Sequence, residues 1–520
     1  MTRGVWRRAA AAVMAAGAAI ALVAGCTPTS SAPAPAPSPH RTPVTQGAPA
    51  GFERYYGQKV DWKSCRGVDD GDYYCASITA PENWSDAGGE DIRLSVIVRL
   101  ASSGEATGSL FVNPGGPGAS GVDMVQQAAS FAVGNELLDS YDVVGFDPRG
   151  VGRSTAVRCF DPAAMDRYLF DIPSAPRGTP ERTSEQESSA ESFARACDVN
   201  SDGLLPFITT QNAARDLDLL RGVLGDEKLS YLGYSYGSFL GATYADLFPK
   251  NVGRVVLDGG LDPSIPSAIV GARQAAGFQS AFDAYLARCL TGSDCPFTGT
   301  VANARQQMGD ALAAVDASPL AASDGRMLGA DSLVTGVVSA LYSEGNWPVL
   351  SSALTGVLEG DPDEMFELVD RYYNRYDGTY LDNSTEAFSA YNCMDYPADP
   401  ADVVTRANDE VAEKAPTFAP YWSSDVSLCD AWPYPPTGTR DEIHAEGAAP
   451  ILVIGTTNDP ATPYEWSAAL AEQLSSGILL TRVGEGHTGF NKGNACIDDA
   501  VVAYFEHDTV PEGDLRCEAP

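Results

Sequence analysis

The pentapeptide Gly233-Tyr-Ser-Tyr-Gly237 constrains the fold of this chain more than any other feature of its sequence. It follows a short apolar run, 229–232, and precedes a helix-like stretch, 239–247. In a strand, G-x-S-x-G, helix unit the turn is so tight that the flanking positions must be nearly free of side-chain atoms, which accounts for the two glycines. Such a turn holds Ser235 at the top of a sheet with its hydroxyl exposed. It also aims the N–H of Tyr236 at the place where an oxyanion would form.

Short apolar runs alternate with helical stretches from about residue 90 onward. Several of these runs are continuous, as expected of strands that are covered on both faces. The stretch 213–224 has apolar residues at helical spacing and follows Thr209 and Thr210, which are candidate caps. The alternation predicts an α/β fold with an open, mostly parallel sheet and helices on both faces. The predicted strands are 94–100, 109–112, 141–146, 229–232, 254–257, 451–454 and 478–483.

The alternation stops between about residues 262 and 430, where helical patterns replace it. A helical block inserted into a continuing sheet predicts a cap over the carboxyl ends of the strands, where ligands bind in such folds. We therefore expect a sheet domain made of 51–261 and 431–520, with a cap at 262–430. The predicted cap helices are 269–290, 301–315, 332–342, 348–358 and 363–373.

Residues 1–25 have the pattern of an export signal, in which three arginines precede the apolar stretch 9–23. This stretch is shorter than a membrane-spanning helix requires. It ends in Val-Ala-Gly-Cys26, which resembles a bacterial lipobox whose cysteine becomes the lipidated first residue. Residues 26–50 are mainly Ser, Thr, Pro and Ala, a composition that predicts an extended tether. We expect a cell-envelope or secreted protein that meets the membrane only through a lipid on Cys26.

The cysteine content also indicates export. Setting Cys26 apart, the 11 cysteines leave an even number that fall into near neighbours in sequence. Disulfides persist in oxidising compartments outside the cytoplasm. Neither a Cys-x-x-Cys pair nor a histidine cluster is present, so we expect no metal site and no cofactor. Proximity predicts the disulfides Cys65–Cys75, Cys159–Cys197, Cys289–Cys295, Cys393–Cys429 and Cys496–Cys517.

The charge of the chain excludes one class of partner. The sequence has 69 acidic and 34 basic residues and a formal net charge of −35. The phosphates of a nucleic acid would be repelled by such an excess. Because the acidic residues are spread along the chain, they indicate a solvated surface and identify no substrate.

A serine nucleophile needs a general base and an acid that orients the base. In a fold of this type the acid precedes the histidine along the chain. His487 lies in a Gly-rich loop directly after a predicted strand, so we expect it to be the base, whereas His507 lies in a polar stretch near the surface. Asp459 leaves the preceding predicted strand in the same way and is the expected acid. Asp258, at the end of an earlier strand, is the alternative.

The second oxyanion donor is expected in Asn113-Pro-Gly-Gly-Pro-Gly118, which follows the predicted strand 109–112. Glycines allow a backbone N–H to approach a ligand without an intervening Cβ. Gly116 is the preferred donor, and Gly115 is the alternative.

The segment Asp147-Pro-Arg-Gly-Val-Gly-Arg-Ser154 follows the predicted strand 141–146. A functional role is conceivable for its charged residues. We interpret the segment instead as a loop that is braced by a buried Asp–Arg pair.

Five motifs of this chain occur together and in one order. They are Asn113-Pro-Gly-Gly-Pro-Gly, Asp147-Pro-Arg-Gly-x-Gly-x-Ser, Gly233-Tyr-Ser-Tyr-Gly, Asp459-Pro-x-Thr-Pro and Gly486-His-Thr. In this combination residues 60–520 resemble the actinobacterial tripeptidyl aminopeptidases, which are exported α/β-hydrolases related to the proline iminopeptidases. The resemblance implies an α/β-hydrolase fold with a helical cap and a catalytic triad of Ser235, Asp459 and His487. It also implies a peptide substrate, cleaved into short peptides from a free amino terminus.

The resemblance leaves two site residues and the substrate class open. In the related iminopeptidases, acidic cap residues hold the substrate ammonium group. Cys393-Met-Asp395 resembles the family's Cys-x-Asp segment, so Asp395 is a candidate for that role, with bracing of a loop as the alternative. The iminopeptidases have His-Gly-Gly-Pro where this chain has Pro114-Gly-Gly-Pro117, so the resemblance does not decide between Gly115 and Gly116 as the oxyanion donor. Mycobacterial members have been called both proteases and carboxylesterases. Ester cleavage by the same triad is therefore the alternative activity, and a non-catalytic surface binding protein is a remote one.

Overall fold

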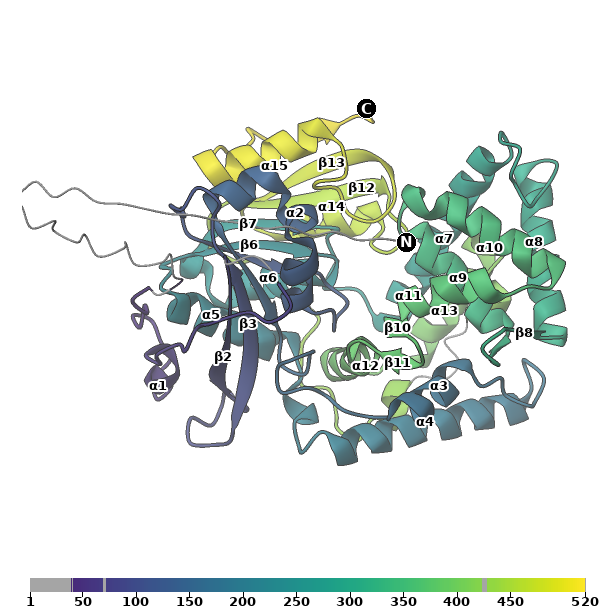
Figure 1. The fold of residues 1–520 in the computed structure, drawn as a ribbon, viewed down its shortest axis with the longest axis horizontal. Helices are drawn as coiled ribbons and strands as arrows, with labels where there is room; N and C mark the ends of the chain where they lie inside the picture. Colours follow the sequence, from purple (N-terminus) through teal and green to yellow (C-terminus); the bar gives the residue numbers. More distant parts are fainter. Residues whose placement is uncertain (1–38, 40, 69–71, 423–427, 520) are drawn as a thin grey trace, which may run out of the picture. The chain divides into compact units, whose positions relative to one another are not determined.

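A ten-stranded sheet lies at the centre of this computed structural model, which describes residues 39, 41–68, 72–422 and 428–519 (Figure 1). The strand order is β1-β2-β3-β5-β4-β6-β7-β12-β13-β14. All neighbours from β5 to β14 pair in parallel, whereas β1, β2, β3 and β5 pair antiparallel. The predicted mostly parallel sheet is confirmed. The strands are β1 (Lys63–Ser64), β2 (Tyr73–Pro81), β3 (Asp91–Arg99), β4 (Ser109–Asn113), β5 (Asp142–Asp147), β6 (Leu229–Tyr234), β7 (Val252–Asp258), β12 (Ile451–Asn458), β13 (Gly477–Glu485) and β14 (Leu515–Cys517).

The strand order reverses around β4, which lies between β5 and β6. Asn113 at the end of β4 pairs with Gly233 at the end of β6. The loops that follow these two strands therefore leave the sheet side by side. Such a reversal point opens a crevice at the carboxyl ends of the strands, which is where ligands bind in open α/β sheets.

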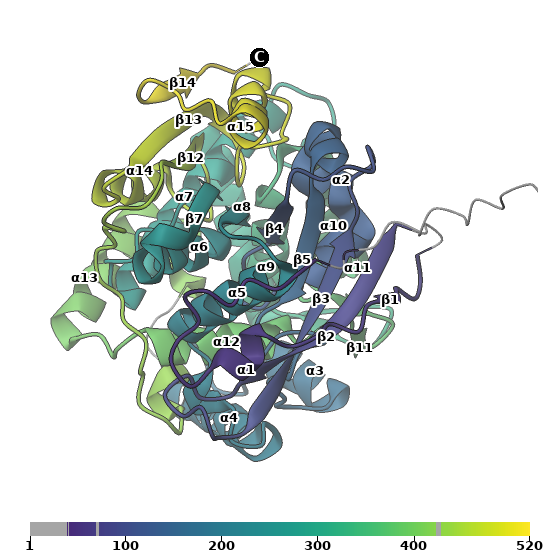
Figure 2. The same ribbon diagram turned by 90° about the vertical axis from the view of Figure 1, so that its left-hand side faces the viewer.

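Helices cover both faces of the sheet (Figure 2). Each face has its own apolar cluster. Helix α5 shows why these segments are helical. Thr209 accepts a hydrogen bond from the N–H of Asn212 as an N-cap, and Gly225 ends the helix at φ 87°. One face carries α2 (Gly121–Ser140) and α15 (Ala495–His507), and the other carries α5 (Thr210–Leu224), α6 (Tyr236–Leu247) and α14 (Tyr464–Gln473).

The chain between β7 and β12 forms the helical cap, which has its own apolar cluster. All five predicted cap helices are present, and two more follow them. The only extended pieces among the described cap residues are two short ribbons, β8–β9 and β10–β11. No helix of the described residues is long and apolar enough to span a membrane. The cap helices are α7 (Ser267–Cys289), α8 (Val301–Ala317), α9 (Ala330–Leu341), α10 (Trp347–Glu359), α11 (Asp363–Tyr372), α12 (Ser384–Asp395) and α13 (Ala401–Lys414).

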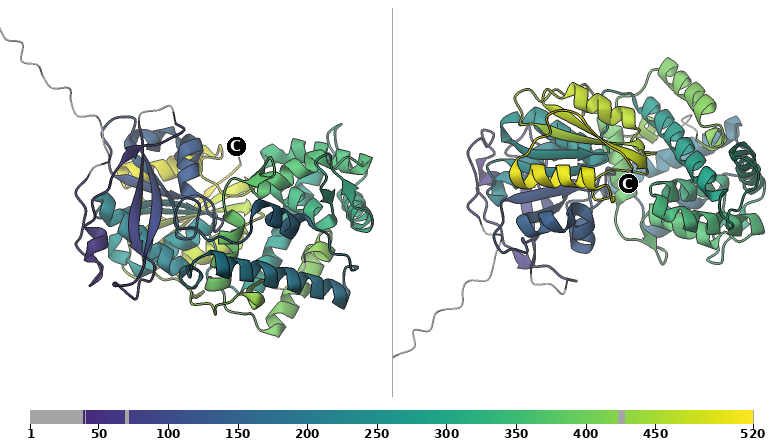
Figure 3. Two further views of the ribbon diagram at one scale, coloured as in Figure 1. Left: turned by 60° about the horizontal axis from the view of Figure 1, so that its bottom comes forward. Right: turned by 90° about the horizontal axis from the view of Figure 1, so that it is seen from above.

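A segment that we expected within the sheet domain contacts the cap instead (Figure 3). It comprises α3 (Pro162–Phe170) and α4 (Pro180–Asn200), which lie between β5 and β6 in sequence. Arg177 pairs with Asp331 of the cap at 2.9 Å, and Arg375 of the cap pairs with Asp166 of α3 at 2.8 Å. The C-terminal half of α4 packs into the main core. This segment therefore links the two parts of the fold.

The N-terminal arm also differs from the expectation. Residues 41–50 were predicted to belong to an extended tether, yet they lie against the folded core. Arg41 pairs with Asp142 at 2.5 Å and with Asp226 at 3.0 Å, and the N–H of Val44 donates to the carbonyl of Gly222. Asp142 begins β5 and Asp226 precedes β6, so the arm is held at the amino ends of these two strands. The predicted export signal and Cys26 lie outside the described residues.

Five disulfides are present, and they join the same pairs that proximity in sequence predicts. They are Cys65–Cys75, Cys159–Cys197, Cys289–Cys295, Cys393–Cys429 and Cys496–Cys517. Three of them hold parts of the sheet domain or its flanking segments, and two hold cap segments.

Candidate active site

Ser235 occupies a strained backbone position between β6 and α6. Its φ of 56° and ψ of −123° lie where a residue with a Cβ is disfavoured. A Cβ on Gly233 would lie 2.3 Å from the carbonyl oxygen of Gly237, so the turn admits no side chain there. Hydrogen bonds hold the turn: the N–H of Ser235 donates to Asp258 O at 2.8 Å, and Ser238 donates to Ser235 O from both its N–H and its hydroxyl. The strain fixes the direction in which the Ser235 side chain points.

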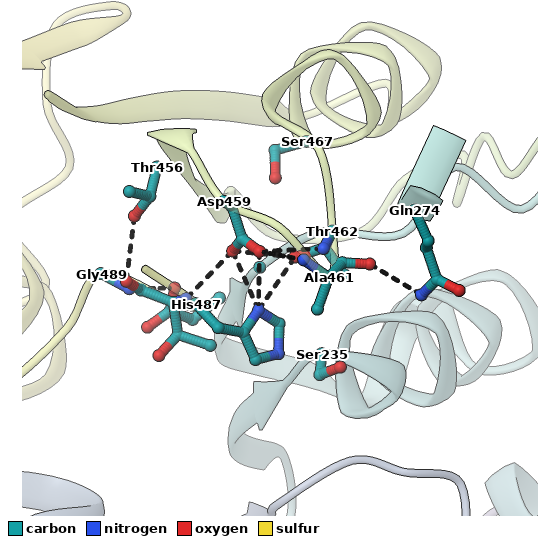
Figure 4. A network of polar contacts seen from close by, with 12 residues as sticks. Ser235, Gln274, Thr456, Asp459, Ala461, Thr462, Ser467, His487 and Gly489 are labelled. Carbon is teal, nitrogen blue, oxygen red and sulfur yellow. Dashed lines mark hydrogen bonds and ion pairs between the residues drawn. The ribbon is translucent and has the colours of Figure 1, made fainter. Parts of the chain in front are cut away.

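His487 and Asp459 form a hydrogen-bonded pair beside Ser235 (Figure 4). Nδ1 of His487 lies 2.9 Å from both carboxylate oxygens of Asp459. A carboxylate only accepts hydrogen bonds, so Nδ1 carries the proton and Nε2 keeps a lone pair. Figure 4 shows Ser235 on the side of the imidazole away from Asp459. Nε2 therefore lies on the side of the imidazole that faces Ser235, and no hydrogen bond joins the two side chains.

The carboxylate of Asp459 is buried and held by the turn that follows β12. It accepts hydrogen bonds from the N–H groups of Ala461 and Thr462, both at 2.9 Å, and from the N–H of Thr488 at 3.0 Å. The Thr462 hydroxyl donates at 3.0 Å and also lies 3.3 Å from Nδ1 of His487. This threonine belongs to the Asp459-Pro-x-Thr-Pro motif, whose pattern predicts no role for it. The sequence signal for this contact is a turn-forming Asp-Pro. In such a turn the N–H groups two and three residues after the Asp point back at its carboxylate.

The two alternatives for the acid and the base occupy other environments. Asp258 accepts from the N–H of Gly489 at 2.7 Å and from the N–H of Phe490 at 2.8 Å. Burial raises the pKa of Asp258 to about 6. Through these two hydrogen bonds Asp258 anchors the loop that carries His487. His507 ends α15, and its side chain is 71% exposed.

Two backbone N–H groups beside Ser235 are free to hold an oxyanion. A Cβ on Gly115 would lie 2.9 Å from the Cβ of Ser235 and 3.2 Å from the nitrogen of Tyr236, so this loop lies against the elbow. The N–H of Gly115 itself donates to Asn113 Oδ1 at 3.0 Å. Within the described part of the chain, the N–H groups of Gly116 and Tyr236 have no intramolecular acceptor. The geometry therefore favours Gly116 over Gly115.

The cap contacts His487 directly through Tyr342, which follows α9. The N–H of His487 donates to the carbonyl of Tyr342 at 2.9 Å, and the two rings meet edge to face at 5.4 Å. Gly486, at φ 91°, passes so close that a Cβ would lie 3.1 Å from the Tyr342 carbonyl oxygen. Only 12% of the His487 side chain is exposed. No local pattern pointed to Tyr342, because the contact joins residues far apart in sequence.

Asp395 does not have the environment that binding of a substrate ammonium group requires. It is 3% exposed and accepts from the N–H of Thr210 at 3.0 Å and from the Thr210 hydroxyl at 2.6 Å. A carboxylate enclosed in this way is closed to a ligand. The structure favours the alternative, in which Asp395 braces the start of α5. Burial raises its pKa to about 6.

The Asp147 segment braces a loop, but not through the predicted Asp–Arg pair. Asp147 accepts from the Ser120 hydroxyl at 2.5 Å and from the N–H of Arg153 at 2.8 Å. Arg149 is fully buried and makes a two-pronged pair with Asp216 at 2.7 and 2.8 Å. Each charged residue of the motif therefore has a different partner.

Comparison with known proteins yields relatives along most of the chain. Residues 415–517 match the family described as TAP-like protein. The chain is 34% identical to serine protease Hip1 of Mycobacterium tuberculosis (strain ATCC 25618 / H37Rv), over 91% of this chain and 94% of that protein. It is 37% identical to carboxylesterase B of the same strain, over 91% and 92%. It is 30% identical to a tripeptidyl aminopeptidase of Streptomyces coelicolor, over 91% and 88%. Among solved structures, a proline iminopeptidase of Mycobacterium smegmatis matches with a TM-score of 0.30 and 14% identity, over 83% of this chain and 93% of that one.

Proposed function

Because this chain belongs to the α/β-hydrolase family of Hip1, carboxylesterase B and the tripeptidyl aminopeptidases, and is a serine hydrolase, we propose that it is an exported aminopeptidase. It would release short peptides from free amino termini through an acyl-enzyme. The observation that carries this proposal is the arrangement of Ser235, His487 and Asp459, with two free N–H groups beside the serine.

The proposed reaction follows from these positions. Nε2 of His487 takes the hydroxyl proton of Ser235 while the serine oxygen attacks the peptide carbonyl. The N–H groups of Gly116 and Tyr236 hold the oxyanion that forms. His487 then gives its proton to the leaving amine, and water, activated by the same imidazole, hydrolyses the acyl-enzyme. Asp459 keeps the proton on Nδ1 and stabilises the imidazolium.

Acidic groups of the cap support a peptide with a free amino terminus over an ester. The first turn of α12 lies against the oxyanion loop, since a Cβ on Gly118 would lie 2.7 Å from the carbonyl oxygen of Ser384. Two residues further on, burial raises the pKa of Glu386 to about 7, and nearby Asp382 contributes. These two carboxyls line a cavity of about 370 Å³ together with Asp123, Arg153 and Arg158, and Arg153 pairs with Asp123 at 2.7 Å. Glu386 and Asp382 form no ion pair among the described residues, so they are the groups that would attract an ammonium group bound there.

The substrate class is tested with three matched compounds: a tripeptide anilide with a free amino terminus, its N-acetylated form and a nitrophenyl ester. We expect kcat/KM to be highest for the free amino terminus. Ser235→Ala should lower kcat at least about a hundredfold for all three while the far-UV circular dichroism spectrum stays unchanged. Full activity of this variant would disprove the site. Equal kcat/KM for the free and acetylated anilides, with a faster ester, would instead support the carboxylesterase alternative.

The same assay tests the cap carboxyl. Glu386→Gln should raise KM for the free anilide about tenfold, the size of a lost charge-assisted hydrogen bond, and leave the ester unchanged. Glu413→Gln, an exposed position on α13, is the matched control. An equal rise of KM for the ester would show that Glu386 shapes the site without reading an ammonium group.

We also propose export and anchoring through Cys26. The five disulfides support an oxidising location. In an actinobacterial host, Cys26→Ser should move the protein from the membrane fraction to the soluble fraction. Retention of this variant in the membrane fraction would contradict a lipid on this cysteine.

A further inference from the structure

Asp395 is a buried cap carboxylate whose contacts lead to the elbow. It ends α12, where the disulfide Cys393–Cys429 holds the last turn of the helix. Its two oxygens accept hydrogen bonds from Thr210 alone among the residues that the structure describes: from the N–H at 3.0 and 3.2 Å, and from the hydroxyl at 2.6 Å. Thr210 begins α5, so its N–H belongs to the group of helix N–H donors without an intrahelical acceptor. A negative charge is favoured at this end of a helix.

The Thr210 hydroxyl has a single proton, which decides the direction of its hydrogen bond with Tyr236. The Thr210 hydroxyl oxygen also lies 2.6 Å from the hydroxyl oxygen of Tyr236. Burial raises the pKa of Asp395 to about 6, so the carboxyl is ionised at neutral pH and can only accept. Thr210 must therefore give its single hydroxyl proton to Asp395. Tyr236 is then the donor to Thr210, and the chain of donors runs from Tyr236 through Thr210 to Asp395.

This chain of hydrogen bonds ends at an oxyanion donor. Tyr236 is the first residue of α6, its side chain is buried, and its N–H has no acceptor within the described residues. Its ring packs against Tyr391 of α12 at 5.7 Å and against Phe239 at 6.1 Å. The backbone on its other side is the strained Ser235. A ring fixed at its far end limits how far the adjacent N–H can move.

We propose that Asp395 is a positioning residue that fixes the oxyanion hole from the cap, acting through Thr210 and the phenol of Tyr236. The inference rests on the proposed role of Ser235 and Tyr236 in the reaction. Replacement of the carboxylate by an amide weakens the chain, because a neutral amide oxygen accepts a hydrogen bond less strongly than a carboxylate and the second oxygen is lost. The Thr210 hydroxyl is then held less firmly, and so is the phenol of Tyr236 that donates to it. The ring then shifts, and small misplacements of reacting groups cost large factors in rate.

The decisive experiment is a double-mutant cycle between Asp395→Asn and Tyr236→Phe. Asp395→Asn should lower kcat about tenfold or more with KM nearly unchanged. Tyr236→Phe lacks the phenol through which Asp395 acts, so adding Asp395→Asn to it should cost no further activity. Thr210→Val should behave like Asp395→Asn, and Thr210→Ser, which keeps the hydroxyl, should restore most of the rate. Additive losses in the double variant would overturn the proposal.

A second readout separates the oxyanion hole from general damage to the fold. A peptide aldehyde that adds reversibly to Ser235 forms a tetrahedral adduct with the charge of the intermediate. Its inhibition constant should rise in Asp395→Asn and Thr210→Val by the same factor by which kcat falls. If both variants keep wild-type kcat and aldehyde affinity while Ser235→Ala is inactive, only the role of Asp395 is wrong. If Ser235→Ala is active, the proposed site fails and this inference fails with it.

Discussion

Two buried aspartates near His487 show how the partners of a residue, rather than its type, decide its role. Asp459 and Asp258 end neighbouring parallel strands, and both accept hydrogen bonds from the segment that carries the histidine. Asp459 accepts a hydrogen bond from the Nδ1–H of the imidazole, whereas Asp258 accepts hydrogen bonds from two backbone N–H groups further along the loop. In the proposed reaction the first aspartate orients the base, and the second holds the shape of the loop.

Paired substitutions distinguish these roles. Asp459→Asn should lower kcat about 10,000-fold, because the amide favours the wrong imidazole tautomer while the geometry is kept. Asp258→Asn should keep activity within about tenfold, since its amide oxygen still accepts one of the two loop N–H groups. Both variants are measured on the same anilide, with thermal unfolding as the check on folding. A loss in Asp258→Asn as large as that in Asp459→Asn would contradict the assignment of the acid.

The sequence predicts the residues that leave parallel strands, and it fails for residues whose partners are distant. Ser235, Asp459 and His487 each directly follow a recognisable strand, and such loops converge at one edge of the sheet. The Cys-x-Asp spacing says nothing about which way Asp395 faces. It lies one helical turn after the buried Tyr391, on the packed face of α12. Arg149 is similar, because it lies in a loop and its partner Asp216 lies on α5, far along the chain.

At the scale of elements, regular periodicity decides what can be predicted. Each of the five predicted cap helices agrees with the structure within two residues at either end. Helix α2 was not predicted, and it is interrupted at Ala128 (φ −145°) and Gly134 (φ 74°), which breaks its apolar spacing. Strand β2 was also missed, because it pairs antiparallel near the edge and is half exposed, without a continuous apolar run.

The cap elements take part in shaping the site beyond covering it. The end of α9 supplies the Tyr342 carbonyl that holds the backbone of His487, and the end of α12 supplies Asp395 beneath Tyr236. Helices α3 and α4 join this assembly although they precede the elbow in sequence. The apolar spacing of α3 and α4 does not distinguish them from helices that cover the sheet. Only tertiary contacts show that they also border the cap, such as the pair between Arg177, in the loop that joins them, and Asp331.

For the whole molecule, buried carboxyls make stability depend on pH. Burial raises the pKa of Asp258 and Asp395 to about 6 and that of Glu386 to about 7. In the unfolded chain these groups titrate near 4. Between the two values the folded state binds more protons, so the free energy of unfolding falls as pH rises through this window. The formal net charge of −35 acts in the same direction, since self-repulsion grows as carboxyls ionise.

Asp395→Asn isolates one of these groups. In the wild-type protein a single such carboxyl contributes up to about 1.4 kcal/mol per pH unit inside its window. We expect the drop in unfolding free energy between pH 5 and pH 7.5 to be about 1–2 kcal/mol smaller in the variant, because an amide does not titrate. Urea unfolding at about 0.3 M salt, where surface charges are screened, measures this difference. Asp166, whose pKa is lowered by Arg375 and Tyr380 despite its desolvation, loses its stabilising effect only at more acidic pH and does not interfere. An identical pH dependence in the two proteins would show that the Asp395 carboxyl titrates in the folded state as it does in the unfolded chain.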